Sequence, residues 1–210
     1  MSRRVRGVAH ARRRLLAGCA ALALAGCNAS PSGGNKEPSF SGVDITGTGI
    51  ARSLALADPD GRPRTLADWK GKVVVVFFGY TQCPDVCPTT MAALAQVKQA
   101  LGPSGDRLQV IFVTVDPERD TSEILKRYMA SFDPSFVALR GTPEETAAAA
   151  KEFKLYYAKV PGRRGDGSYT IDHTAGSFVF DALGRARLFV RFGGDGAALK
   201  HDLQALLAAS

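Results

Sequence analysis

Two cysteines separated by three residues are the most reactive groups that this 210-residue sequence places in one short segment. They are Cys83 and Cys87, in the run Gln82-Cys83-Pro84-Asp85-Val86-Cys87-Pro88, which follows an apolar stretch and precedes a helical pattern. The free N–H groups and dipole of a helix N-terminus stabilise negative charge. Because the thiolate is both the nucleophile and the metal ligand, we expect both thiols to favour the thiolate. The pair could then act as a redox couple or as two arms of a chelate.

A structural disulfide is the simplest alternative for the pair, because a disulfide can form in an oxidising compartment. A loop as short as the one between Cys83 and Cys87 gives little entropic stabilisation, however. The position between a strand end and a helix start is also where α/β sheets place their ligands. These two points favour a functional pair.

One of the three histidines is well placed to complete a metal site. His10 lies in the N-terminal leader and His201 lies among leucines of a predicted helix, whereas His173 directly precedes a predicted strand. In the fold predicted below, the segment with His173 faces the cysteine turn. Two thiolates and one imidazole suit copper(I), which accepts three ligands, and the imidazole also suits copper(II). Zinc would want a fourth ligand, for which Asp85, Asp172 or water would have to serve.

The first 26 residues have the features of an export signal. They contain six arginines and no acidic residue, followed by an apolar run over 15–26 that is shorter than the roughly 20 residues of a membrane span. The run ends in Leu24-Ala25-Gly26-Cys27, which resembles a bacterial lipobox with Cys27 as the lipidated residue. We therefore predict a lipoprotein signal peptide over 1–26 and a membrane-anchored protein facing the periplasm or the cell exterior. Ordinary cleavage and an uncleaved anchor are the alternatives, and the choice between inner and outer membrane stays open.

The basic charge is concentrated in that leader. Removing its six arginines from the 27 basic residues leaves 21, against 20 acidic residues. The remaining chain is nearly neutral, so we expect no nucleic-acid partner.

The rest of the chain predicts a tether and one α/β domain. Residues 27–42 are rich in Ser, Gly, Pro and Asn, which is typical of a flexible, lipidated tether. Residues 43–210 alternate apolar runs and helical patterns. We expect strands near 72–78, 108–115, 177–180 and 187–192, and helices near 88–101, 120–132, 142–153 and 195–207. This order predicts a thioredoxin-like fold, with a central mixed sheet flanked by helices.

Two polar segments of this domain have simple structural explanations. Asp116-Pro117-Glu118-Arg119-Asp120 follows a predicted strand, and we interpret it as a helix start in which Asp120 and Glu123 cap each other. The alternative is a supporting or docking role beside the metal. The Gly-rich basic run over 159–167 predicts a solvated turn just ahead of His173.

Several of these motifs together resemble the Sco/SenC family. They are Phe78-Gly79-Tyr80-Thr81-Gln82-Cys83-Pro84-Asp85-Val86-Cys87-Pro88, Val115-Asp116-Pro117-Glu118-Arg119-Asp120-Thr121 and Asp172-His173-Thr174. The resemblance implies a thioredoxin-like fold and one copper bound by Cys83, Cys87 and His173. It also implies a role in assembling the dinuclear copper centre in a subunit of cytochrome c oxidase, by delivering copper, by reducing that subunit's cysteines, or both. Family members are often held by a transmembrane helix, whereas this sequence predicts a lipid anchor.

Two further activities compete with a copper metallochaperone. A thiol–disulfide oxidoreductase would cycle Cys83 and Cys87 between dithiol and disulfide. Dedicated oxidoreductases of this fold have two residues between their cysteines and a facing cis-proline, whereas this chain has three residues and His173-Thr174 there. A thiol peroxidase is ranked lower, because no distinctive peroxide-binding arginine motif surrounds Cys83.

Overall fold

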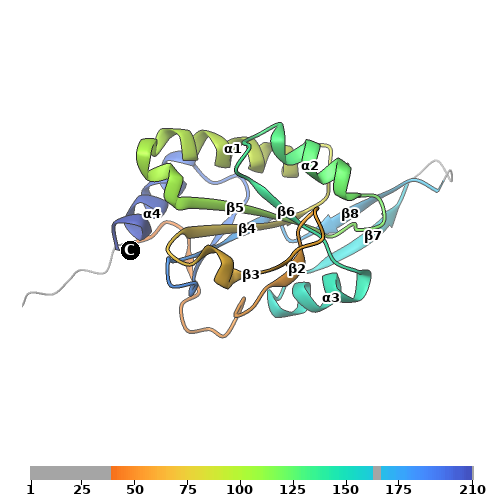
Figure 1. Ribbon diagram of the computed structural model, residues 1–210, viewed down its shortest axis with the longest axis horizontal. Helices are drawn as coiled ribbons and strands as arrows, with labels where there is room; N and C mark the ends of the chain where they lie inside the picture. Colours follow the sequence, from red (N-terminus) through yellow and green to blue (C-terminus); the bar gives the residue numbers. More distant parts are fainter. Residues whose placement is uncertain (1–38, 163–166, 210) are drawn as a thin grey trace, which may run out of the picture. The chain divides into compact units, whose positions relative to one another are not determined.

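A six-stranded mixed sheet forms the centre of the computed structural model, which describes residues 39–162 and 167–209 (Figure 1). Its strand order is β1-β10-β9-β4-β5-β6. The strands are β1 (Val43–Asp44), β4 (Val73–Gly79), β5 (Leu108–Thr114), β6 (Val137–Leu139), β9 (Gly176–Phe180) and β10 (Ala186–Arg191). Strands β4, β5 and β6 pair in parallel, and β9, β10 and β1 add in antiparallel fashion. The predicted mixed sheet is therefore confirmed.

The central strands are buried on both faces. Every residue of β4, β5 and β9 is buried, as expected for continuous apolar runs in a sheet covered on both sides. Phe77 of β4 lies directly beside Phe112 of β5 in the parallel register. This register brings the end of β4, where the cysteine turn begins, next to the end of β5.

In the part of the chain that the structure describes, the α-helices around the sheet are α1 (Val86–Ala100), α2 (Ser122–Ala130), α3 (Pro143–Glu152) and α4 (Gly196–Ala208). In Figure 1, α1 and α2 lie along one face of the sheet and α3 lies below the other. Thr142 and Glu145 form a capping box at the start of α3, and the side chain of Asp195 caps α4. Two short helices are η1 (Leu66–Trp69) and η2 (Gly102–Arg107), and β2 (Ala55–Ala57) and β3 (Pro63–Thr65) form a small antiparallel sheet.

The start of α2 differs from the prediction. The cap is Thr121, whose side chain accepts a hydrogen bond from the N–H of Ile124 at 3.3 Å. Asp120 does not cap the helix with Glu123, because its carboxylate is buried and turned toward the cysteine turn. The predicted capping pair was therefore wrong.

A second small sheet was not predicted. Strands β7 (Tyr157–Pro161) and β8 (Tyr169–His173) form an antiparallel hairpin, where the sequence predicted a solvated turn over 159–167. Residues 163–166 of that run lie outside the described residues. The hairpin matters because His173 is the last residue of β8 and not part of a loop.

The predicted signal peptide, Cys27 and most of the tether over 27–42 lie outside the described residues. At the end of that tether, the N–H groups of Ser41 and Gly42 donate to the carboxylate of Asp202 at 2.9 and 2.8 Å. Asp202 is a buried residue of α4. Among the described helices, none has both the length and the apolar character that a membrane crossing requires.

Candidate metal centre

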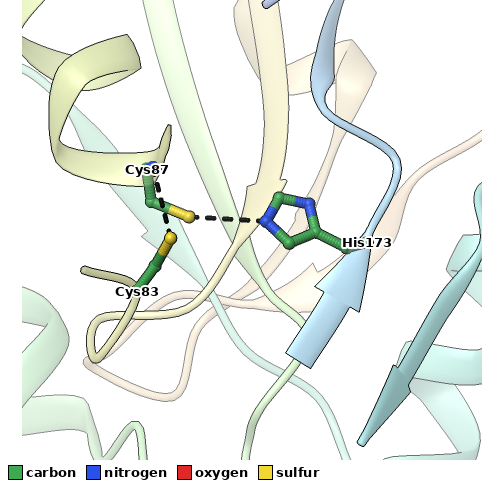
Figure 2. Close-up of side chains that lie close together, drawn as sticks. All are labelled: Cys83, Cys87 and His173. Atoms are coloured by element: carbon green, nitrogen blue, oxygen red, sulfur yellow. Dashed lines mark hydrogen bonds between the residues drawn. The ribbon is translucent and has the colours of Figure 1, made fainter. Parts of the chain in front are cut away.

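The side chains of Cys83, Cys87 and His173 converge on one point, although the histidine lies 86 residues after the second cysteine (Figure 2). The Cys87 Sγ atom lies 3.5 Å from His173 Nε2. The ligand atoms of all three residues lie within 4.8 Å of one another. Neither Asp85 nor Asp172 belongs to this group in the described part of the chain. The three side chains that the sequence singled out could thus hold one metal ion.

The cysteines flank the first turn of α1. Strand β4 ends at Gly79, and α1 begins at Val86, so that Cys83 precedes the helix and Cys87 lies inside it. The N–H of Cys87 is one of the donors that a helix N-terminus leaves without a helical partner. It points at the Cys83 Sγ atom at 3.5 Å. The helix start therefore supports negative charge on the sulfur of Cys83.

Cys87 does not match the prediction that both thiols favour the thiolate. Its side chain is completely buried, and this burial raises the pKa of the Cys87 thiol far above its ordinary value. Cys83 is only half-buried. The centre is therefore asymmetric, with an accessible Cys83 and a Cys87 that stays a thiol until a metal or a disulfide partner displaces its proton.

This asymmetry predicts ordered alkylation of the metal-free, reduced protein. Cys83 is expected to react with iodoacetamide at least about tenfold faster than Cys87, because burial shields the Cys87 sulfur and raises the pKa of its thiol, and only the thiolate reacts. Peptide mass spectrometry of a time course at neutral pH measures both rates. Equal rates, or faster labelling of Cys87, would contradict the buried position of Cys87.

His173 is held in a state ready to bind a metal. Its Nδ1 atom lies 3.1 Å from the carbonyl oxygen of Thr174, and because a carbonyl only accepts, the proton belongs on Nδ1. The lone pair of Nε2 then faces the sulfur of Cys87. Burial lowers the pKa of His173, so the imidazole is neutral near pH 7. The rings of Phe77 and Tyr80 meet the imidazole edge-on, with centroids 5.9 and 6.2 Å away.

The carboxylate of Asp120 anchors the cysteine turn through hydrogen bonds. It accepts hydrogen bonds from the N–H and the hydroxyl of Thr81 at 3.1 and 2.6 Å, and from the hydroxyl of Thr114 at 2.6 Å. Burial raises the pKa of Asp120. These bonds tie the segment two residues before Cys83 to the end of β5. The supporting role was the alternative weighed for this acidic segment, and no pattern in the sequence pointed to Thr81 or Thr114 as its partners.

The arrangement permits two kinds of chemistry. Two sulfurs and one neutral imidazole form a donor set for a soft metal ion, and two nearby free thiols can also form a disulfide. The centre is only partly exposed, because Cys87 is buried. Transfer of a metal therefore has to proceed through Cys83 and the half-buried His173, and attack on a disulfide has to proceed through Cys83.

Comparison with known proteins gives one consistent result. The sequence pattern of the SCO1/SenC family matches residues 45–208. The SCO2-like protein of Rickettsia felis is 32% identical over 136 residues, which cover 65% of this chain and 66% of that protein. The mouse protein SCO2 homolog, mitochondrial, is 36% identical over 62% of this chain and 52% of that protein. The match thus spans slightly under two thirds of the bacterial relative and about half of the mouse one.

Two solved structures extend this likeness to three dimensions. The structure of Bradyrhizobium japonicum ScoI with copper bound is 39% identical, with a TM-score of 0.67 over 75% of this chain and 99% of that one. The apo Sco1 protein from Thermus thermophilus is 43% identical, with a TM-score of 0.70 over 80% and 97%. Together with the mixed sheet and its flanking helices, they confirm the thioredoxin-like fold. Since the family pattern covers nearly the whole described domain, this chain belongs to the SCO1/SenC family.

Proposed function

We propose that this protein is an exported copper metallochaperone, anchored to the membrane through a lipid on Cys27. It binds one copper through Cys83, Cys87 and His173 and assists assembly of the dinuclear copper site of cytochrome c oxidase. The partner is the subunit of the oxidase that bears this copper site. Copper is the cargo of the protein, carried as copper(I) and in a second state as copper(II).

The convergence of two sulfurs and one imidazole within 4.8 Å carries this proposal. Thiolates are soft ligands that select copper(I), and a three-ligand site suits that ion. The hydrogen bond from Nδ1 to the Thr174 carbonyl presents Nε2 to the centre, as is usual for metal-binding histidines. The 39% identical Bradyrhizobium protein has copper bound in its structure, which supports copper as the metal here.

The different exposure of the three ligands suggests how copper leaves the protein. Cys83 and His173 are half-buried, whereas Cys87 is not exposed. An incoming ligand of the client can therefore replace Cys83 or His173 first, while Cys87 keeps the ion bound until the exchange is complete. This order keeps the copper from escaping into solution during the transfer.

A thiol–disulfide oxidoreductase is the second candidate, favoured by the two free thiols and the accessible Cys83. Cys83 as thiolate would attack a disulfide of the client, forming a mixed disulfide and releasing one client thiolate. Cys87 would then lose its proton and attack Cys83 Sγ, which frees the second client thiol. Two electrons pass to the client, and the Cys83–Cys87 disulfide that remains can no longer bind the metal.

One transfer experiment separates these candidates. The reduced full-length chain, in detergent and without oxygen, is titrated with copper(I) and mixed with the metal-free, reduced copper-bearing subunit of the oxidase, because only free thiolates can receive the ion. A second portion of the reduced chain, without copper, is mixed with the same subunit in its oxidised form. We expect one copper per chain and its movement to that subunit, measured by metal analysis after separation. Thiol counting on both proteins measures any disulfide exchange.

The outcomes are distinct. Copper in the initially reduced subunit supports the metallochaperone, and new thiols on the initially oxidised subunit support the oxidoreductase. A chain that binds no copper and leaves the client disulfide intact contradicts both candidates.

A further inference from the structure

His173 lies on a hairpin that is not paired with the central sheet. Strands β7 and β8 pair only with each other in the described structure, and Figure 1 shows them extending beyond the helices at one end of the sheet. Ile171 is the buried hydrophobic residue of β8. An isolated two-stranded hairpin is only marginally stable in water. The distance between His173 and the cysteines therefore depends on the contacts that fasten this hairpin to the domain.

Arg119 makes several of these contacts at once. Its Nη1 atom donates to the carbonyl oxygen of Tyr169 at 2.9 Å, and its guanidinium lies 3.6 Å from the centroid of the Tyr169 ring. Its Nε atom donates to Asp116 at 2.5 Å, and the hydroxyl of Tyr169 donates to the other oxygen of Asp116 at 2.8 Å. Arg119, Asp116 and Tyr169 thus form a closed ring of interactions, which we call the hairpin latch.

The latch acts on the strand that carries the ligand. Tyr169 and His173 are four residues apart in β8, so their side chains lie on the same face of the strand. Asp116 is buried and carries the charge that compensates Arg119. A second contact joins the same segment to the hairpin: Lys159 of β7 pairs with Glu118. Both side chains are exposed, and exposed ion pairs contribute little to stability.

The segment over 116–120, which contains Arg119, also contacts the turn that carries the cysteines. Asp120, the residue after Arg119, binds Thr81 two residues before Cys83. The segment over 116–120 contains no ligand, yet it contacts both parts of the chain that supply ligands. It is therefore placed to set the spacing between the imidazole and the two sulfurs.

We propose that Arg119 is a positioning residue for the metal centre, which acts through Tyr169 to hold His173 at the cysteines. The copper measurements that test this proposal rest on the proposed function, whereas the hydrogen-exchange measurement on the metal-free chain does not. The guanidinium matters for its shape, because it donates from Nε and Nη1 in two directions while its plane stacks on Tyr169. A lysine would keep the charge that Asp116 needs but could not make these contacts together.

The test compares Arg119→Lys with a matched substitution, Arg127→Lys. Arg127 pairs with Glu123 within α2, and both side chains are exposed. In the metal-free reduced chain, we expect amide hydrogens of β7 and β8 to exchange roughly tenfold faster in Arg119→Lys, as for the loss of one charge-assisted hydrogen bond. Amides of β4 and β5 are expected to exchange as in the native chain, and Arg127→Lys is expected to change neither region.

A second measurement asks whether Arg119 acts through His173. We expect copper(II) to leave Arg119→Lys roughly tenfold faster than the native chain when a chelator is added, with loss of imidazole nitrogen coupling in the electron paramagnetic resonance spectrum. In a His173→Ala background, Arg119→Lys is expected to have no further effect, because coupled residues are not additive.

Unchanged exchange in β7 and β8, or the same acceleration of copper release with and without His173, would overturn the proposal. If the native chain binds no copper, the proposed function fails, and the exchange measurement alone decides whether Arg119 holds the hairpin.

Discussion

Replacing Cys83 and Cys87 by alanine is expected to abolish copper(I) binding, because these substitutions remove both soft ligands of the centre. Each single replacement is expected to have nearly the same effect, since one sulfur and one imidazole cannot complete a three-ligand site. Anaerobic titration against a competing copper(I) chelator measures the loss. Stoichiometric binding by the double variant, at the native affinity, would refute the assigned ligands.

The histidine ligand is expected to behave differently from the cysteines. His173→Ala should keep copper(I) on the two sulfurs, with lower affinity. Its loss of copper(II) affinity should exceed the roughly 10–100-fold loss that follows when a residue supporting a metal ligand is replaced. The matched control is His201→Ala, because His201 is exposed on α4 beside Asp202. We expect native binding of both copper ions by this control, and equal losses in the two variants would argue against His173 as a ligand.

Gly79→Ala is expected to damage both the fold and the centre. A Cβ at this position would lie 2.8 Å from Cys87 Sγ, 2.8 Å from Phe77 Cε1 and 3.0 Å from Phe112 Cε2. All three neighbours are fully buried, so none can move aside freely. We expect the free energy of unfolding to fall by about 1–3 kcal/mol, as for other overpacked cores, and copper affinity to fall because the sulfur is displaced.

Urea denaturation of the metal-free chain and copper titration measure these two effects. Gly196→Ala is the matched control, since its Cβ meets no atom within 4 Å and the residue opens α4. This control is expected to match or slightly exceed the native stability. A Gly79→Ala variant with native stability and native copper affinity would show that the core at the end of β4 is looser than these distances imply.

Local patterns predicted most of the fold. The apolar runs near 72–78 and 108–115 identified strands β4 and β5, and the helical pattern near 142–153 identified α3. Both kinds of signal depend on neighbours close in sequence or on a simple periodicity. The family resemblance was likewise carried by short motifs, and the family match over residues 45–208 confirms it.

The errors arose where long-range contacts outweigh local preference. Asp120 stands one position before Thr121, the cap of α2, and is a residue type that often caps helices, but its hydrogen bonds to Thr81 and Thr114 place it in the interior. The run over 159–167 has the composition of a turn, although its first residues pair with β8. Thr81 lies 39 residues before Asp120, too far for a local pattern to indicate this contact.

The sequence by itself determined which atoms are available for chemistry: two sulfurs beside a helix start and one imidazole ahead of a strand. Only the tertiary structure decided that Cys87 is buried while Cys83 remains accessible, and that His173 arrives on a hairpin held by Arg119. The physical reason is that residue types and spacing specify donor atoms and local backbone geometry. Burial, which shifts the pKa values, and the contacts between distant segments exist only once the chain is packed.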